Sequence, residues 1–154
     1  MSQKIEMLKA FAETGFSRLG RAIKDLNEEQ LDWRSCPEAN TLRWILTHLS
    51  HELHVFVPMI ITGNREYTPE GWPEDYVDNP DFTLEKIVRD LEEGKDKLMD
   101  TLDSLGPHTL EEEIDWFIGK QPKTQYILLA ISEIHHHEGQ IAAILGLKER
   151  MGEI

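Results

Sequence analysis

Four long segments of the chain carry apolar residues at steps of three and four positions, and this spacing constrains the fold more than any other feature. Residues spaced in this way share one face of an α-helix, whereas side chains in a strand alternate with a period of two. The segments cover residues 2–26, 41–62, 83–105 and 123–147. The sequence therefore predicts four amphipathic helices, and no long strand competes with them.

Polar and helix-breaking residues mark the expected ends of these helices. Asn40 and Thr83 are suitable N-caps for the second and third helices, because a short polar side chain there accepts a free backbone N–H. Gly63 is expected to end the second helix. Pro58 lies inside that helix and should bend it, since proline lacks a backbone N–H.

Four helices with apolar stripes predict an all-α fold, namely a four-helix bundle in which each stripe packs against the others. The 154 residues, 40% of them apolar, are enough for one core, so residues 1–154 are expected to form a single domain. The second connection, residues 64–82, is long enough to run the length of a helix at roughly 3.3 Å per residue. Such a crossover would let the second and third helices run parallel.

The third connection, residues 107–124, is also long, and part of it alternates between apolar and polar side chains. Ile114, Trp116 and Ile118 are each separated by one residue, which is the spacing of a strand. A short β-hairpin is therefore expected before the fourth helix.

The charge of the chain excludes several classes of partner. Lys and Arg total 16 against 29 Asp and Glu, a net charge of −13, so nucleic acids and anionic membranes would be repelled. No apolar run has the length of a secretory signal or a membrane span. The single cysteine, Cys36, suits a reducing compartment. We expect a cytoplasmic protein that binds neither nucleic acid nor membrane.

Histidine and glutamate lie on or beside the apolar face of two predicted helices. At about 100° per residue, His48 and Glu52 fall on the flank of the apolar face of the second helix. His51 and His54 point away from that face. The pair at i, i+4 is therefore expected to be partly buried.

On the fourth helix the same projection separates three consecutive histidines. Glu133 and His137 fall within the apolar arc, whereas His135 and His136 fall outside it. The run of three histidines therefore contributes one inward imidazole rather than three.

Buried imidazoles and carboxylates must be hydrogen-bonded, paired or bound to a metal, and the spacing fits two such arrangements. In one, His–Glu hydrogen bonds lie in the core without any metal. In the other, His48, Glu133 and His137 hold a divalent metal such as Zn, Ni or Fe, with positions left for water or substrate.

Two other metal motifs fit poorly. A dinuclear carboxylate site needs two Glu-x-x-His pairs and two further glutamates, and this chain has one such pair, Glu133 with His136. The His-Glu-x-x-His motif of zinc proteases is absent.

Three further side chains have roles that the sequence leaves open. Trp72, in the acidic second connection, either packs locally or closes over a site or a partner subunit. Arg34 and Arg43 are the basic residues nearest the candidate site in sequence. We expect them to pair with the abundant acidic side chains rather than with a substrate.

Three stretches of the chain resemble the DinB-like (DinB/YfiT-type) family of metal-dependent hydrolases and transferases. They are LNEEQLDWR after the first helix, NTLRWILTHL at the start of the second, and HHEGQI in the fourth. The order and spacing of the three carry the resemblance, which spans nearly the whole chain. It implies an up-down-down-up bundle with the crossover between helices two and three, and a homodimer.

The resemblance also implies a metal site. The family takes one histidine from the second helix and a His-x-x-x-His pair from the fourth, and His48 and His137 match this pattern. Glu133 stands where the pattern has the first histidine of the pair. A glutamate adds negative charge and lowers the affinity for borderline metals, so a member without metal is the alternative.

The activity that the resemblance implies is thiol S-transfer or hydrolysis of a small-molecule substrate. The metal would lower the pKa of a low-molecular-weight thiol co-substrate such as bacillithiol or mycothiol. Glu52 would be the catalytic base or would orient a ligand. The alternative is a non-catalytic dimeric bundle that is metal-free, or that binds a metal or ligand for sensing or stress response.

Overall fold

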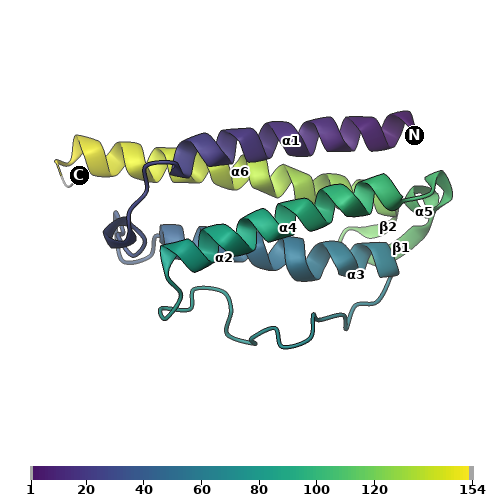
Figure 1. The fold of residues 1–154 in the computed structure, drawn as a ribbon, viewed down its shortest axis with the longest axis horizontal. Helices are drawn as coiled ribbons and strands as arrows, with labels where there is room; N and C mark the ends of the chain where they lie inside the picture. The colour runs from purple at the N-terminus through teal and green to yellow at the C-terminus, as the bar shows by residue number, and fades with distance from the viewer. Residues whose placement is uncertain (1, 153–154) are drawn as a thin grey trace.

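The computed structural model describes residues 2–152 and is mainly helical (Figure 1). Its elements are α1 (Gln3–Ile23), the 3₁₀ turn η1 (Glu28–Gln30), α2 (Leu42–His51), the π-helical turn η2 (Glu52–Phe56), α3 (Val57–Thr62), α4 (Leu84–Ser104), α5 (Pro107–Glu111), β1 (Glu113–Trp116), β2 (Gly119–Pro122) and α6 (Lys123–Arg150). The predicted all-α class holds for most of the chain, and the antiparallel pair β1–β2 departs from it.

Four helical rods lie side by side along the long axis of the molecule: α1, α4, α6, and the rod formed by α2, η2 and α3 (Figure 1). α1 contacts α4 and α6, and α2 contacts the same two helices. Figure 1 shows α1 and α6 running in one direction and α2 and α4 in the other. The chain between α3 and α4 travels back along the molecule, as expected for the crossover of residues 64–82.

Polar side chains cap the starts of the long helices, with one shift from the prediction. The hydroxyls of Ser2 and Thr83 each accept the backbone N–H three residues further on, at the starts of α1 and α4. At α2 the cap is Thr41, which accepts the N–H of Trp44 at 3.0 Å, and not Asn40. Both residue types cap helices well, so the sequence does not distinguish between the two positions.

Where a bend was predicted at Pro58, the structure has the π-helical turn η2 immediately before α3. Proline cannot donate a backbone hydrogen bond, and just before it the N–H of Val57 donates five residues back to the carbonyl of Glu52. A π turn holds more residues per turn than an α-helix. A projection at 100° per residue therefore fails from Glu52 onward.

His54, which the projection directed away from the apolar face, is buried, with 4% of its surface exposed. It lies within η2, where the helical phase has changed. Its Nε2 donates to the backbone oxygen of Asp90 at 2.7 Å, and the Lys97 ammonium donates to its Nδ1 at 3.2 Å. The outward placement of His54 was therefore wrong. His51 is half-buried.

Trp72 holds the crossover against the α2–η2 rod. Its indole N–H donates to Nδ1 of His51 at 3.0 Å. Its ring stacks on His54 and on Tyr76, with centroids 4.8 and 4.2 Å apart. Tyr76 is itself buried and donates its hydroxyl to Asp90 at 2.6 Å. Of the roles left open for Trp72, local packing within the chain is the one observed.

The predicted hairpin is present, and α6 holds it in place. β1 and β2 pair so that Trp116 faces Gly119, which leaves residues 117–118 as the turn. The hydroxyl of Tyr126 in α6 accepts the N–H of Trp116 at 3.0 Å and donates to the carbonyl of Gly119 at 2.7 Å. Gly119 has φ +83°, a conformation that suits glycine.

The core consists of aliphatic and aromatic side chains from all four rods, including Leu8, Phe16, Leu46, Leu49, Leu98, Leu102, Ile131 and Ile134. At one crossing α4 approaches η2 so closely that Gly94 has no room for a side chain. A Cβ atom at Gly94 would lie 2.8 Å from the Cβ of Leu53. Among residues 2–152, no helix combines the length and the hydropathy that a membrane span requires.

We expect Gly94→Ala to lower the free energy of unfolding by about 1–3 kcal/mol, because the added methyl group overpacks the α4–η2 contact. Urea denaturation measures the change. Gly20→Ala is the matched control, since a Cβ at Gly20 in α1 meets nothing within 4 Å, and it should stabilise by up to about 1 kcal/mol. Equal effects of the two substitutions would contradict the close approach.

Acid should destabilise the protein partly through His54. Burial is the main cause that lowers the pKa of His54 below its usual 6.5, so the unfolded chain takes up this proton at a higher pH than the folded protein. The contribution to stability is therefore complete above about pH 6.5 and is lost as the pH falls toward the folded-state pKa. Between pH 7 and pH 5, the free energy of unfolding measured in urea should fall less in His54→Gln than in the wild type. The same loss in both proteins would refute this assignment.

Candidate metal centre

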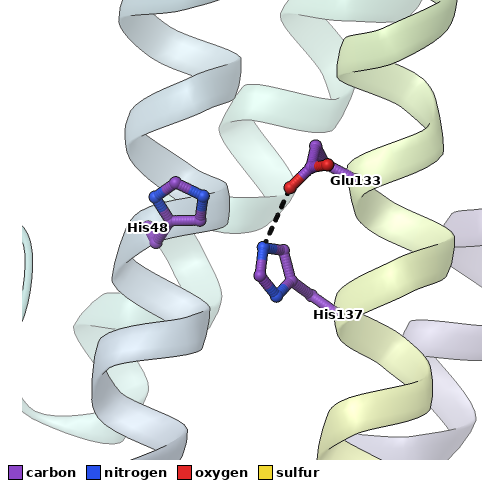
Figure 2. Close-up of side chains that lie close together, drawn as sticks. All are labelled: His48, Glu133 and His137. Carbon is purple, nitrogen blue, oxygen red and sulfur yellow. Dashed lines mark ion pairs between the residues drawn. The ribbon is translucent and has the colours of Figure 1, made fainter. Parts of the chain in front are cut away.

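His48 of α2 meets Glu133 and His137 of α6 in the space between these two helices (Figure 2). One ligand-type atom from each residue lies within 4.8 Å of the others. Within residues 2–152, this is the one group of three or more His, Cys, Asp or Glu side chains that converge in this way. The structure thus brings together the three residues selected from the sequence, here called the His/Glu/His cluster.

His137 is buried, and its two ring nitrogens have different surroundings. Nδ1 lies 2.6 Å from Oε1 of Gln140, so Nδ1 carries the proton and donates it to the amide oxygen. Nε2 then presents a lone pair, and this buried atom has no hydrogen-bond partner. A histidine that binds a metal is typically held in this way, with its other ring N–H bonded to a protein acceptor.

Glu133 faces this unpartnered nitrogen. Its Oε2 lies 3.1 Å from Nε2 of His137, as the dashed line in Figure 2 shows. The distance is that of an ion pair, but Nε2 forms no directed hydrogen bond. Ligands at about 2.0–2.2 Å from a shared metal ion lie roughly 3 to 3.5 Å apart, depending on the angle at the metal. The separation therefore fits two ligands of one ion, and two imidazoles with a carboxylate suit Zn, Ni or Fe.

His48 completes the cluster from α2. Trp44, one helical turn earlier, stacks on its imidazole with centroids 4.7 Å apart and an interplanar angle of 13°. The ring meets that of His137 nearly edge-on, at 5.0 Å between centroids. Burial, and then the neighbouring His137, lower the pKa of His48. Its imidazole is therefore kept neutral, which is the form that binds metals.

Glu52, the predicted catalytic residue, lies beside the cluster but is not part of it. Its Oε1 is 3.6 Å from Nε2 of His48, too far for a hydrogen bond, and its buried Oε2 has no partner. Burial, and then the charge of Glu133, raise the pKa of Glu52 to about 8. Without a cation nearby, this carboxyl is protonated at neutral pH. Its catalytic role stays a prediction.

An apolar pocket of about 320 Å³ lies next to the cluster, and Glu133 borders both. Its walls come from η2, α6 and the hairpin turn, and they are formed by Glu52, Phe56, Phe117, Leu129, Ala130 and Glu133. Glu52 also lies on this pocket. A small molecule bound there would contact the carboxylate that faces His137.

The other histidines of the run lie away from the cluster, as predicted. His135 faces α1, where it stacks on the ring of Phe11 at 4.1 Å and its Nε2 bonds to the Phe11 carbonyl at 2.9 Å. His136 is exposed and contacts the side-chain amide of Gln140.

Both arginines near the site in sequence are engaged elsewhere. Arg43 is buried and forms a bidentate pair with Asp32 at 2.7 and 2.9 Å, as expected. Arg34 donates to the carbonyl oxygens of Pro37 and Ala39, so its observed partners are backbone atoms rather than an acidic side chain.

The sequence suggested packing, or a place in a ligand pocket, for Trp44, and the structure shows it stacked on His48, four residues on. Two further residues that shape the site were given no role from the sequence. Gln140 lies three residues after His137, so helical spacing could have identified it. Phe117 has no such local signal, because its position beside α6 depends on how the hairpin folds.

The fold and the cluster together define a mainly helical protein with a candidate metal centre between two of its helices. The sequence matches the DinB superfamily over residues 12–141, which is most of the chain and includes the whole cluster. The protein therefore belongs to the DinB superfamily, which confirms the resemblance seen in its motifs. No curated protein matches the chain significantly.

In zinc titrations against a competing chelator, Gln140→Leu should weaken metal affinity about 10- to 100-fold, because His137 loses the acceptor that fixes its ring and its protonation. Gln125→Leu, near the start of the same helix, is the control and should leave the affinity unchanged. If both variants bound zinc as the wild type does, Gln140 would have no orienting role.

Proposed function

We propose that this protein is a metal-dependent enzyme that transfers a group to, or hydrolyses, a small substrate, with a divalent ion held by His48, Glu133 and His137. The observation that supports this is the imidazole of His137, whose buried Nε2 has no hydrogen-bond partner while Nδ1 is tied to Gln140. Leaving a buried polar atom unpaired costs about 1–3 kcal/mol. An ion that accepts the lone pair would remove this cost.

Three protein ligands would leave coordination positions free for another molecule. A Zn, Ni or Fe ion held there would supply Lewis-acid chemistry and lower the pKa of a thiol or a water molecule. The pocket bordered by Glu133 would give a substrate access to the same place.

Glu52 is the residue we assign to proton transfer. It borders the pocket and lies beside His48, within reach of a molecule that enters the cluster from the pocket side. Without a metal, burial and Glu133 raise its pKa to about 8. A divalent ion at the cluster would offset the charge of Glu133 and bring this pKa down from that value, which would let the carboxyl accept and return a proton near pH 7.

Thiol S-transfer is the first reaction to consider, and hydrolysis is the second. The low-molecular-weight thiol co-substrate and the homodimer are parts of the same proposal, and they rest on the resemblance in the motifs. The cytoplasmic location is also part of it, and it rests on the single cysteine and on the lack of a signal-like apolar run in the sequence. Membership of the DinB superfamily is compatible with all of them.

In a second candidate function, the cluster is present but the protein catalyses no reaction. The 3.1 Å contact between Glu133 and His137 is short enough to act as an ion pair by itself. In that case the protein would be a non-catalytic helical protein, metal-free or holding a metal or ligand for sensing or stress response. Metal content and turnover distinguish the two functions.

The test begins with protein purified without an affinity tag and measured for bound metal by elemental mass spectrometry. We expect the wild type to retain a divalent metal and His137→Ala to lose it. His136→Ala, which removes the exposed neighbour outside the cluster, should retain the metal. Equal metal content in the wild type and His137→Ala would overturn the proposed site.

The same preparations then enter an activity screen that combines electrophiles with several low-molecular-weight thiols, alongside small hydrolysable esters and amides. The proposal expects turnover that a chelator abolishes and that added metal restores. A protein that retains its metal but turns over no substrate in either series would favour the non-catalytic function.

A further inference from the structure

The pocket beside the His/Glu/His cluster is mostly apolar, and this limits the kinds of ligand that can bind in it. Four of its six lining residues are apolar, and two of these are the aromatic side chains Phe56 and Phe117. Its polar lining residues are the carboxyls Glu52 and Glu133, and the described lining includes no lysine, arginine, histidine or amide. A carboxylate, phosphate or sugar entering this pocket would therefore find no cation or amide donor among the residues that line it.

Phe117 forms the outer wall of this pocket in an unusual setting. Its side chain is large and apolar, yet 70% of its surface is exposed. It lies in the two-residue turn of the hairpin, with its ring 5.9 Å from the ring of Phe56 and 5.5 Å from that of Tyr126. An exposed aromatic ring on the rim of an apolar pocket offers surface that a ligand can cover.

The hairpin that presents Phe117 is held firmly on both sides. The hydroxyl of Tyr126 bonds to both strands next to the turn, at Trp116 and Gly119. From the crossover side, Arg65 donates to the carbonyl of Asp115 and lies over the Trp116 ring. The position of Phe117 is thus fixed by contacts of its neighbours, while its own ring stays available.

We propose that this pocket takes the apolar, ring-sized end of the substrate, and that Phe117 and Phe56 are the residues that select it. The inference rests on the proposed function, because the polar end of the same molecule would lie toward Glu133 and the cluster. A volume of about 320 Å³ is within the range of small-molecule sites. The substrate class is a small molecule with a neutral aromatic or branched aliphatic group next to the reacting group.

Two hydroxamates that share one metal-binding head and differ in their tails test this inference. Acetohydroxamic acid reports on the metal centre alone, whereas benzohydroxamic acid adds a phenyl ring that the pocket should take up. With zinc-loaded wild-type protein, we expect benzohydroxamate to bind about tenfold more tightly or better, as burial of one phenyl ring implies. Phe117→Ala should remove most of this ratio, and Phe117→Leu should keep part of it.

Ile118→Ala is the matched control, because Ile118 is the other turn residue and is exposed, but it does not line the pocket. It should leave the ratio of the two affinities unchanged. The proposal is overturned if benzohydroxamate binds no more tightly than acetohydroxamate, or if Phe117→Ala and Ile118→Ala give the same ratio. Circular dichroism checks that each variant is folded.

A metal-free arm separates failure of this inference from failure of the proposed function. If neither hydroxamate binds, the metal centre is refuted, and the pocket is judged with N-phenyl-1-naphthylamine, a neutral aromatic fluorophore. After chelation of any metal, the wild type and Ile118→Ala should bind this probe alike, and Phe117→Ala should bind it several-fold more weakly. Equal binding by all three proteins would overturn the assignment of the pocket.

Discussion

Where α2 packs against α6, imidazoles and carboxyls occupy positions that aliphatic side chains fill elsewhere between the rods. A helical core tolerates such groups only if each polar atom finds a partner. Gln140 satisfies one nitrogen of His137, and Trp44 covers one face of His48. What remains is a buried nitrogen directed at a carboxylate. The packing of α2 against α6 brings His48 to this pair, and Glu133 then links the cluster to the pocket and helps to raise the pKa of Glu52.

The charges around the site also favour a bound cation. Glu52 and Glu133 border one small pocket, and the charge of Glu133 is a cause of the raised pKa of Glu52. The chain as a whole carries a net charge of −13. Two carboxyls in a shared apolar space repel one another unless one is protonated or a cation lies between them. A divalent ion at the cluster would relieve this repulsion, and the negative field of the protein would favour its approach.

Helical periodicity was sufficient to predict the long helices and to place His48, Glu133 and His137 on their inward faces, since each prediction rests on spacing within a regular segment. The crossover was predicted from the length of the connection 64–82. His48 was placed correctly because it precedes the π turn, and His54 was misplaced because it lies within it. The cap of α2 was predicted one residue too early, at Asn40 instead of Thr41, because both side chains can accept a free backbone N–H. The pocket could not be predicted, because Phe117 reaches α6 only through the packing of the hairpin.

The pocket has walls of two different origins. The helical wall includes α6, which also carries Glu133 and His137. A substitution in this wall can therefore alter the distances between the candidate ligands. The hairpin wall contributes Phe117 from a two-residue turn and supplies no member of the cluster. Surface turns tolerate substitution and insertion better than packed helices do. Relatives of this protein could therefore diverge in what they accept by altering one turn, while the arrangement that would hold the ion is inherited unchanged.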